Sequence, residues 1–235
     1  MLGLLRDRNR SGSYATVLFI GAGLMATFYL LALYMQQVLR FDPVLAGVAA
    51  LPVAVGIVLS SGISSKLVER LPPRAVAVPG LLVAAAGMYW LSMLAAGSSY
   101  AAHVLPAVFV TYFGLGMGFM PMTLTAVHGV AEERTGVASA LRNTAQQIGA
   151  ALGFAALSAV STSAADGRMP GAAVALREGL AAGDRGAVAE AGEALTHGYT
   201  TGFLVGAGML LVAAVVAMAA VNTRRTQNAA ADLKG

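Results

Sequence analysis

Long runs without a charged residue constrain this chain more than any other feature of its sequence. Five runs free of Asp, Glu, Lys and Arg cover residues 11–39, 43–65, 75–131, 143–165 and 194–223. A charge at the centre of a lipid bilayer costs several kcal/mol, so these runs mark the parts of the chain that lipid can surround. One helix needs about 20 apolar residues to cross the hydrocarbon. Four of the runs therefore predict one membrane-spanning helix each.

The run 75–131 is long enough for two helices, and Gly97-Ser98-Ser99 is its natural break. The composition agrees with a membrane protein, because 57% of the residues are hydrophobic and only 11% are charged, whereas soluble domains average about 25% charged residues. We expect an all-α protein whose six transmembrane helices form one bundle. The predicted spans are 14–36, 44–64, 75–96, 103–126, 141–162 and 199–221.

The distribution of basic residues predicts the orientation, since cytoplasmic segments of membrane proteins carry more Lys and Arg. With the N-terminus inside, eleven basic residues lie in cytoplasmic segments and four lie outside. Both termini of this multi-pass protein are therefore expected in the cytoplasm. Arginine outnumbers lysine thirteen to two, and alanine and glycine are abundant, which hints at a GC-rich bacterial genome and hence at a bacterial cell membrane. The inner residues are Arg6, Arg8, Arg10, Lys66, Arg70, Arg74, Arg134, Arg142, Arg224, Arg225 and Lys234, and the outer ones are Arg40, Arg168, Arg177 and Arg185.

The only sizeable polar segment lies between the last two predicted spans, at 163–198. Within it, 172–182 and 187–195 have the pattern of short amphipathic helices, and Gly183 and Gly186 are expected to separate them. We interpret the segment as a solvated external hairpin that rests on the membrane surface.

Enzymatic and metal-binding chemistry finds no support in the sequence. There is no cysteine, and neither a serine-nucleophile motif nor a metal-ligand spacing such as H-E-x-x-H occurs. The basic residues stand in short clusters between apolar runs, so no nucleic-acid partner is expected. We therefore expect no enzyme activity and no cofactor. All eleven acids and the three histidines lie outside the predicted spans or at their ends, so no proton-exchanging group at membrane depth is visible.

Polar side chains inside the predicted spans are the sharper functional signal, because each needs a protein partner or a wet cavity. Tyr34 and Gln37 fall on one face of the first helix, and Tyr112 interrupts the fourth. The fifth helix has a polar strip on its inner half. Two roles remain possible for these polar side chains: they line a transport pathway, or they form hydrogen bonds between helices. The strip consists of Arg142, Asn143, Thr144, Gln146 and Gln147.

Glycines spaced four residues apart predict close packing of helix backbones. Such pairs are Gly114/Gly118 and Gly149/Gly153, and a third series is Gly198/Gly202/Gly206. The spacing leaves open whether the partner helices belong to this chain.

Several blocks of sequence, in order along the chain, resemble the fourteen-helix drug:proton antiporters of the major facilitator superfamily. Residues 28–57 resemble the seam between helices nine and ten of that family, 114–136 and 136–157 resemble the approach to its penultimate helix and that helix, and 65–76 resemble a degenerate cytoplasmic loop. Arg142 departs from the pattern, because that position is usually apolar. Pro72 replaces the usual glycine of the loop.

The resemblance implies a function for the whole range 1–235 as the C-terminal six-helix bundle of a proton-coupled multidrug efflux antiporter. The transported compounds would be small amphipathic drugs, cations among them. The main proton-carrying acid would lie in an amino-terminal bundle outside this chain. Substrate-pathway residues would be Tyr34, Gln37, Tyr112, Asn143, Gln146 and Gln147, and a cytoplasmic gating loop would contain Lys66, Glu69, Arg70 and Arg74.

Three hypotheses remain open on sequence alone. Met1 is an internal or truncated start of a longer transporter; the chain is a half-transporter that pairs with a second copy or with a separately encoded half; or it is a non-transporting membrane protein that binds other membrane proteins through its glycine faces.

Overall fold

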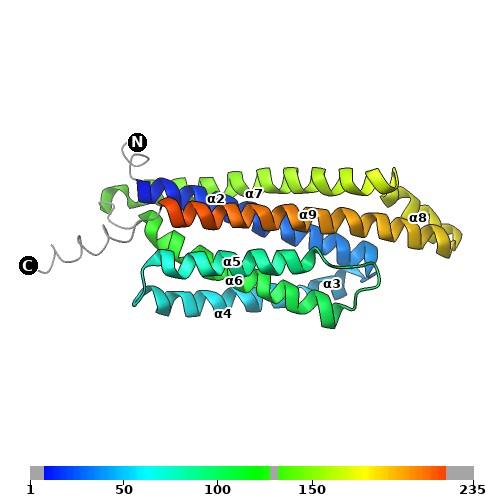
Figure 1. Cartoon of the computed structure of the whole chain (residues 1–235), viewed down its shortest axis with the longest axis horizontal. Helices are drawn as coiled ribbons and strands as arrows, with labels where there is room; N and C mark the ends of the chain where they lie inside the picture. The colour runs from blue at the N-terminus through cyan, green and yellow to red at the C-terminus, as the bar shows by residue number, and fades with distance from the viewer. Residues whose placement is uncertain (1–7, 128–131, 221–235) are drawn as a thin grey trace, which may run out of the picture.

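The computed structural model describes residues 8–127 and 132–220, and it confirms an all-α membrane protein with six helices long and apolar enough to cross a bilayer. The helices run roughly parallel to the long axis of the bundle (Figure 1). The candidate spans are Ser11–Val38, Pro43–Val68, Pro73–Leu91, Tyr100–Thr125, Thr135–Arg168 and Arg185–Ala220.

The first connection shows how the sequence ends one helix and begins the next. Helix α2 (Arg8–Leu33) continues into a wider π-helical turn, η1 (Tyr34–Val38), and the chain then reverses at Arg40, whose φ is 61°. Asp42 caps the next helix, α3 (Pro43–Ala49), because its carboxylate accepts hydrogen bonds from the backbone N–H groups of Val44 at 2.9 Å and Leu45 at 3.0 Å. Proline at the first helical position needs no hydrogen-bond acceptor there.

The connection between the next two helices is short, and a proline begins the second of them. Helix α4 (Leu51–Val68) is followed by a turn, and Pro73 begins α5 (Pro73–Leu91). The break expected around Gly97 separates α5 from the π-helical turn η2 (Tyr100–Val104), which leads into α6 (Leu105–Val127).

The polar segment expected as a loop over 163–198 is mostly helical instead. Its first residues extend α7 (Glu132–Arg168), its middle forms α8 (Ala172–Ala182) as predicted, and its last part begins α9 (Arg185–Ala220). Gly183 ends α8 with a φ of 70°, but Gly186 lies in the first turn of α9. Asp184 explains this start, since its carboxylate accepts from Gly186 N at 2.9 Å and Ala187 N at 3.1 Å.

Helices α7 and α9 therefore extend past the rest of the bundle at the end where α8 lies. Their 37 and 36 residues correspond to about 55 Å of helix at ~1.5 Å per residue, well beyond a hydrocarbon core of ~30 Å. The start of α2 and the end of α9 lie together at the opposite end (Figure 1). That end is the cytoplasmic one by the distribution of basic residues.

Glycines bring the helices into backbone contact, as the spacing predicted, and the partner helices belong to this chain. A Cβ added to Gly153 of α7 would meet Ala22 of α2, and one added to Gly114 of α6 would meet Ala84 of α5. Gly198 of α9 lies against Ser161 of α7 in the same way. The glycine faces are thus used inside the bundle.

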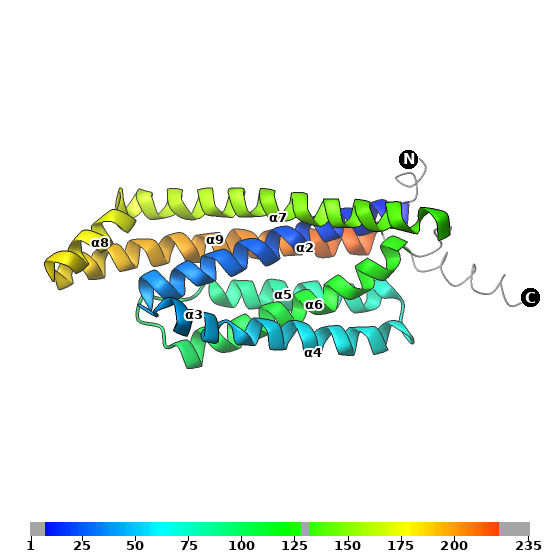
Figure 2. The same ribbon diagram turned by 180° about the vertical axis from the view of Figure 1, so that it is seen from behind.

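Two helices stand out because little of their apolar surface is covered. In their most apolar stretches only 22% of the α3–α4 span and 28% of α7 is buried, against 39–56% for the other four. Successive neighbours in contact are α7, α2, α6 and α4, and this row forms the front of the bundle in Figure 2, with α9 and α5 behind it. We call this the open face; α7 and α4 are its two edges.

Candidate functional site

The polar strip of α7 lies along one edge of the open face. Asn143, Thr144 and Gln147 are exposed, and Gln146 is half-buried. Polar groups do not remain in contact with lipid tails, because no hydrogen-bond partner is available there. The α7 edge therefore requires water or another protein surface beside it.

Arg142 links this strip to α6. Its Nη1 donates to Asn143 Oδ1 at 2.7 Å, and its Nη2 donates to Thr123 Oγ1 at 3.0 Å. The guanidinium also lies over the ring of Phe119, 4.4 Å from the ring centroid, which is the geometry of a cation–π contact. Three contacts from two helices hold this cation in one position.

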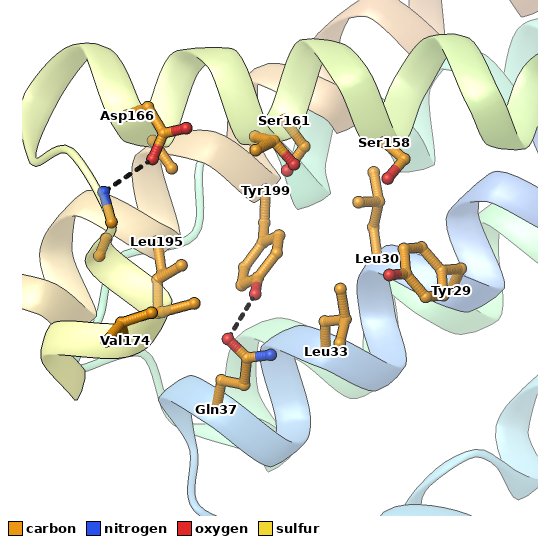
Figure 3. Close-up of a pocket in the computed structure, with 15 residues that line it drawn as sticks. Tyr29, Leu30, Leu33, Gln37, Ser158, Ser161, Asp166, Val174, Leu195 and Tyr199 are labelled. Carbon is orange, nitrogen blue, oxygen red and sulfur yellow. Dashed lines mark hydrogen bonds between the residues drawn. The ribbon is translucent and has the colours of Figure 1, made fainter. Parts of the chain in front are cut away.

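A cavity of about 250 Å³ lies at the opposite end of α7, between α2, α7, α8 and α9. At its centre the hydroxyl of Tyr199 donates to Gln37 Oε1 at 2.9 Å, as Figure 3 shows. Asp166 borders the cavity and accepts from Gly171 N at 3.1 Å. The lining residues are Tyr29, Leu30, Leu33, Gln37, Ser158, Ser161, Thr162, Ala165, Asp166, Gly171, Ala172, Ala173, Val174, Leu195 and Tyr199.

Most of these cavity residues were missed by reasoning from sequence. Tyr199 stands at the start of a predicted span, and Asp166 falls in the segment expected to be a loop. The available signal was the spacing of Ser158, Ser161 and Thr162, which puts polar side chains on the outer turns of α7.

The predicted pathway residues fall into three groups. Asn143, Gln146 and Gln147 lie on the α7 edge, and Gln37 lines the outer cavity. Tyr34 and Tyr112 are completely buried inside the bundle. Their hydroxyls donate to the carbonyl oxygens of Ala95 at 2.8 Å and Leu24 at 3.4 Å. Contact of any of the six with a transported compound stays a prediction.

The predicted gating residues lie around the turn between α4 and α5. Lys66, Glu69 and Arg70 are exposed, and Arg74 is half-buried at the start of α5. The turn is at the same end of the bundle as the start of α2 and the end of α9 (Figure 1). Its charges are therefore available to a partner on the cytoplasmic side.

Metal-ligating side chains do not gather in the described parts of the chain, where no group of three His, Asp or Glu residues could hold a metal ion. His103 is exposed in η2 and His197 is half-buried in α9, whereas His128 lies outside the described residues. Apart from the Asp166 carboxylate at the border of the cavity, the α7 edge and the cavity present hydroxyl, amide and guanidinium groups as their polar side chains.

Six helices that can cross a membrane, with polar groups along an uncovered face, define a multi-pass membrane protein. Comparison with known sequences identifies the family: the sequence profile of the Major Facilitator Superfamily matches residues 2–154. The chain is 37% identical over 231 residues to puromycin resistance protein pur8 of Streptomyces alboniger, an alignment that covers 94% of this chain and 42% of that protein. This chain belongs to the major facilitator superfamily and is a multi-pass protein of the bacterial cell membrane.

Other relatives are also much longer than the part of them that aligns with this chain. The MFS-type transporter EfpA of Mycobacterium tuberculosis (strain ATCC 25618 / H37Rv) is 30% identical over 220 residues, which are 92% of this chain and 39% of EfpA. The multidrug resistance protein B homolog of the same strain is 31% identical over 163 residues, 68% of this chain and 30% of that protein. The chain thus spans about two fifths of the length of the first two relatives.

Proposed function

We propose that this chain is the C-terminal bundle of a proton-coupled multidrug efflux antiporter that exports small amphipathic compounds. The observation that carries the proposal is the open face, where an uncovered α7 presents amide side chains within a membrane span. A transport pathway between two bundles supplies the water or protein surface that these groups require. The relatives' names, which include puromycin and multidrug resistance, support export of drugs.

A second bundle is part of this proposal. Transporters of this kind rock two bundles around a site near the bilayer midplane, and the open face would be the half of that site carried by this chain. The rest of a longer polypeptide or a second copy of the chain would provide the other half. Binding of unrelated membrane proteins through the glycine faces is less well supported, because Gly149 and Gly153 already pack against α2.

Each predicted residue then has a role in the complete machine. Asn143, Gln146 and Gln147 would line the pathway on the α7 edge, and Gln37 with Tyr199 would line its outer end. Tyr34 and Tyr112 would support the α2 segment behind the pathway through their backbone hydrogen bonds. The charges of the α4–α5 turn, Glu69 and Arg70 among them, would contact the second bundle on the cytoplasmic side and favour one access state.

Proton coupling would depend on an acidic group outside this bundle. The described acids lie at helix ends, in α8 or in the first turns of α9, so none is placed to exchange a proton halfway across the bilayer. They are Asp42, Glu69, Glu132, Glu133, Asp166, Glu178, Asp184, Glu190 and Glu193. We propose that the proton-carrying acid belongs to the second bundle.

The test is drug accumulation in an efflux-deficient bacterial host that expresses the complete gene product, with puromycin as the first compound. Expression should lower accumulation, and an uncoupler that dissipates the proton gradient should abolish the difference. Gln146→Ala should raise accumulation again, whereas Val215→Ala, on the lipid-exposed surface of α9, should not. The proposal fails if accumulation of puromycin and of a panel of amphipathic drugs is the same with and without the protein.

A further inference from the structure

Arg142 is a positive charge inside a membrane span, and nothing in the proposed export cycle yet uses it. It lies in the candidate span Thr135–Arg168 and its Nη2 donates to Thr123, two residues before the end of the candidate span Tyr100–Thr125, so it stands toward the cytoplasmic end of the bundle. A charge on a membrane-spanning helix usually marks a functional contact.

The contacts of Arg142 that the structure describes fix its position and are all with uncharged groups. Thr123 and Asn143 each take one N–H, and both are neutral. A guanidinium has five N–H donors, and Nε of Arg142 is buried without any acceptor. Among the residues whose side chains the structure describes, no carboxylate pairs with it. A buried unpaired donor and an uncompensated charge both favour the arrival of an anionic group.

The surroundings also indicate which kind of anion fits. Phe119 covers one face of the guanidinium, so a partner approaches in the plane of the N–H fork, and a planar carboxylate matches that fork with two parallel hydrogen bonds. The neighbouring amide of Gln146 and the exposed side chain of Gln147 lie on the next turn of α7. The site therefore combines a fixed cation with polar and apolar surface on one edge of the open face.

We propose that Arg142, held by Thr123, Asn143 and Phe119, is the binding site for a carboxylate carried by the transported compound at the cytoplasmic end of the pathway. This rests on the proposed export function and gives it a substrate class: amphipathic compounds with a carboxylate, including zwitterions.

The test compares two dyes that differ only in this group, a rhodamine with a free carboxylate and its methyl ester. Binding to the purified complete gene product is measured by fluorescence anisotropy in nanodiscs of phosphatidylcholine. Arg142→Gln should weaken binding of the carboxylate dye by about tenfold or more, because hydrogen bonds to a charged group are lost. Ester binding should stay unchanged, which also shows that the variant is folded. Arg142→Lys should be intermediate, since an ammonium retains the charge without the fork.

Other results overturn the proposal. Equal binding of the carboxylate dye by wild type and Arg142→Gln would mean that Arg142 does not receive it, and a role toward lipid headgroups would then remain. Equal weakening of both dyes would assign Arg142 to the packing of α6 against α7. Arg177→Gln on the exposed side of α8 is the matched control for loss of one positive charge. Export itself is tested separately by drug accumulation in cells. If the dyes show no role for Arg142 in binding but the protein still lowers accumulation, the export function stands and only the carboxylate site is refuted.

Discussion

Gly149 of α7 lies directly against the backbone of Leu18 in α2, so close that a Cβ at position 149 would collide with the Leu18 carbonyl oxygen. The obstacle is backbone, which cannot rotate away as a side chain can. Gly149→Ala should therefore separate the two helices or bend one of them, with a loss of stability of about 1–3 kcal/mol, the range for overpacked sites. The measurement is thermal unfolding of the purified protein in mild detergent.

Gly208→Ala is the matched control for this change. Gly208 lies in the middle of α9, and a Cβ there would have nothing within 4 Å. Its replacement should leave the midpoint of unfolding unchanged or raise it slightly, since alanine favours the helix. Similar midpoints for the two variants would show that α2 and α7 do not pack as described.

Two buried tyrosines should differ in what their hydroxyls contribute. The bond from Tyr34 to the Ala95 carbonyl is 2.8 Å long, whereas that from Tyr112 to the Leu24 carbonyl is 3.4 Å. A good O–H···O bond is about 2.5–3.0 Å long and contributes about 0.5–1.5 kcal/mol. Tyr34→Phe should lower the unfolding midpoint measurably and Tyr112→Phe much less. The reverse order would contradict the assigned partners.

The polar strip of α7 can be distinguished from a lipid-facing surface by cysteine labelling, which is convenient because the chain has no cysteine. Asn143→Cys and Gln147→Cys should react with a membrane-impermeant maleimide added to open membranes. Val215→Cys is comparably uncovered on α9, at 58% exposed, but should stay unlabelled because lipid surrounds it. Should the Asn143 and Gln147 positions both resist labelling in every transport state, their assignment to the pathway would be wrong.

The sequence was most informative where a physical requirement acts on single residues. Uncharged runs long enough to cross a bilayer predicted six helices. Glycine spacing predicted close backbone packing, and the structure shows that the partners are α2 with α7 and α5 with α6. The short helix α8 was predicted with its bounds, because Gly183 provides the left-handed residue that ends it. The short helix predicted over 187–195 and the span predicted over 199–221 are one continuous helix, α9, and Asp184 caps its start.

The candidate site could be predicted only in part, because spacing on a helix does not say what the face meets. Tyr34 and Gln37 were expected to share one face, but the π-helical turn that contains both changes the angle between them. Tyr34 is buried among the helices, while Gln37 reaches Tyr199, a residue 162 positions away along the chain. Contacts over such distances depend on how whole helices pack.

The central claim is that a second bundle covers the open face along α7 and α4. The most direct measurement is the native mass of the complex that contains this chain, isolated from its own membrane through a tag at the carboxy terminus. The 235 residues account for 23.8 kDa. The account predicts a particle of about twice that mass or more, as one longer polypeptide or as two bundles together. A stable monomer near 24 kDa that still lowers drug accumulation would contradict it.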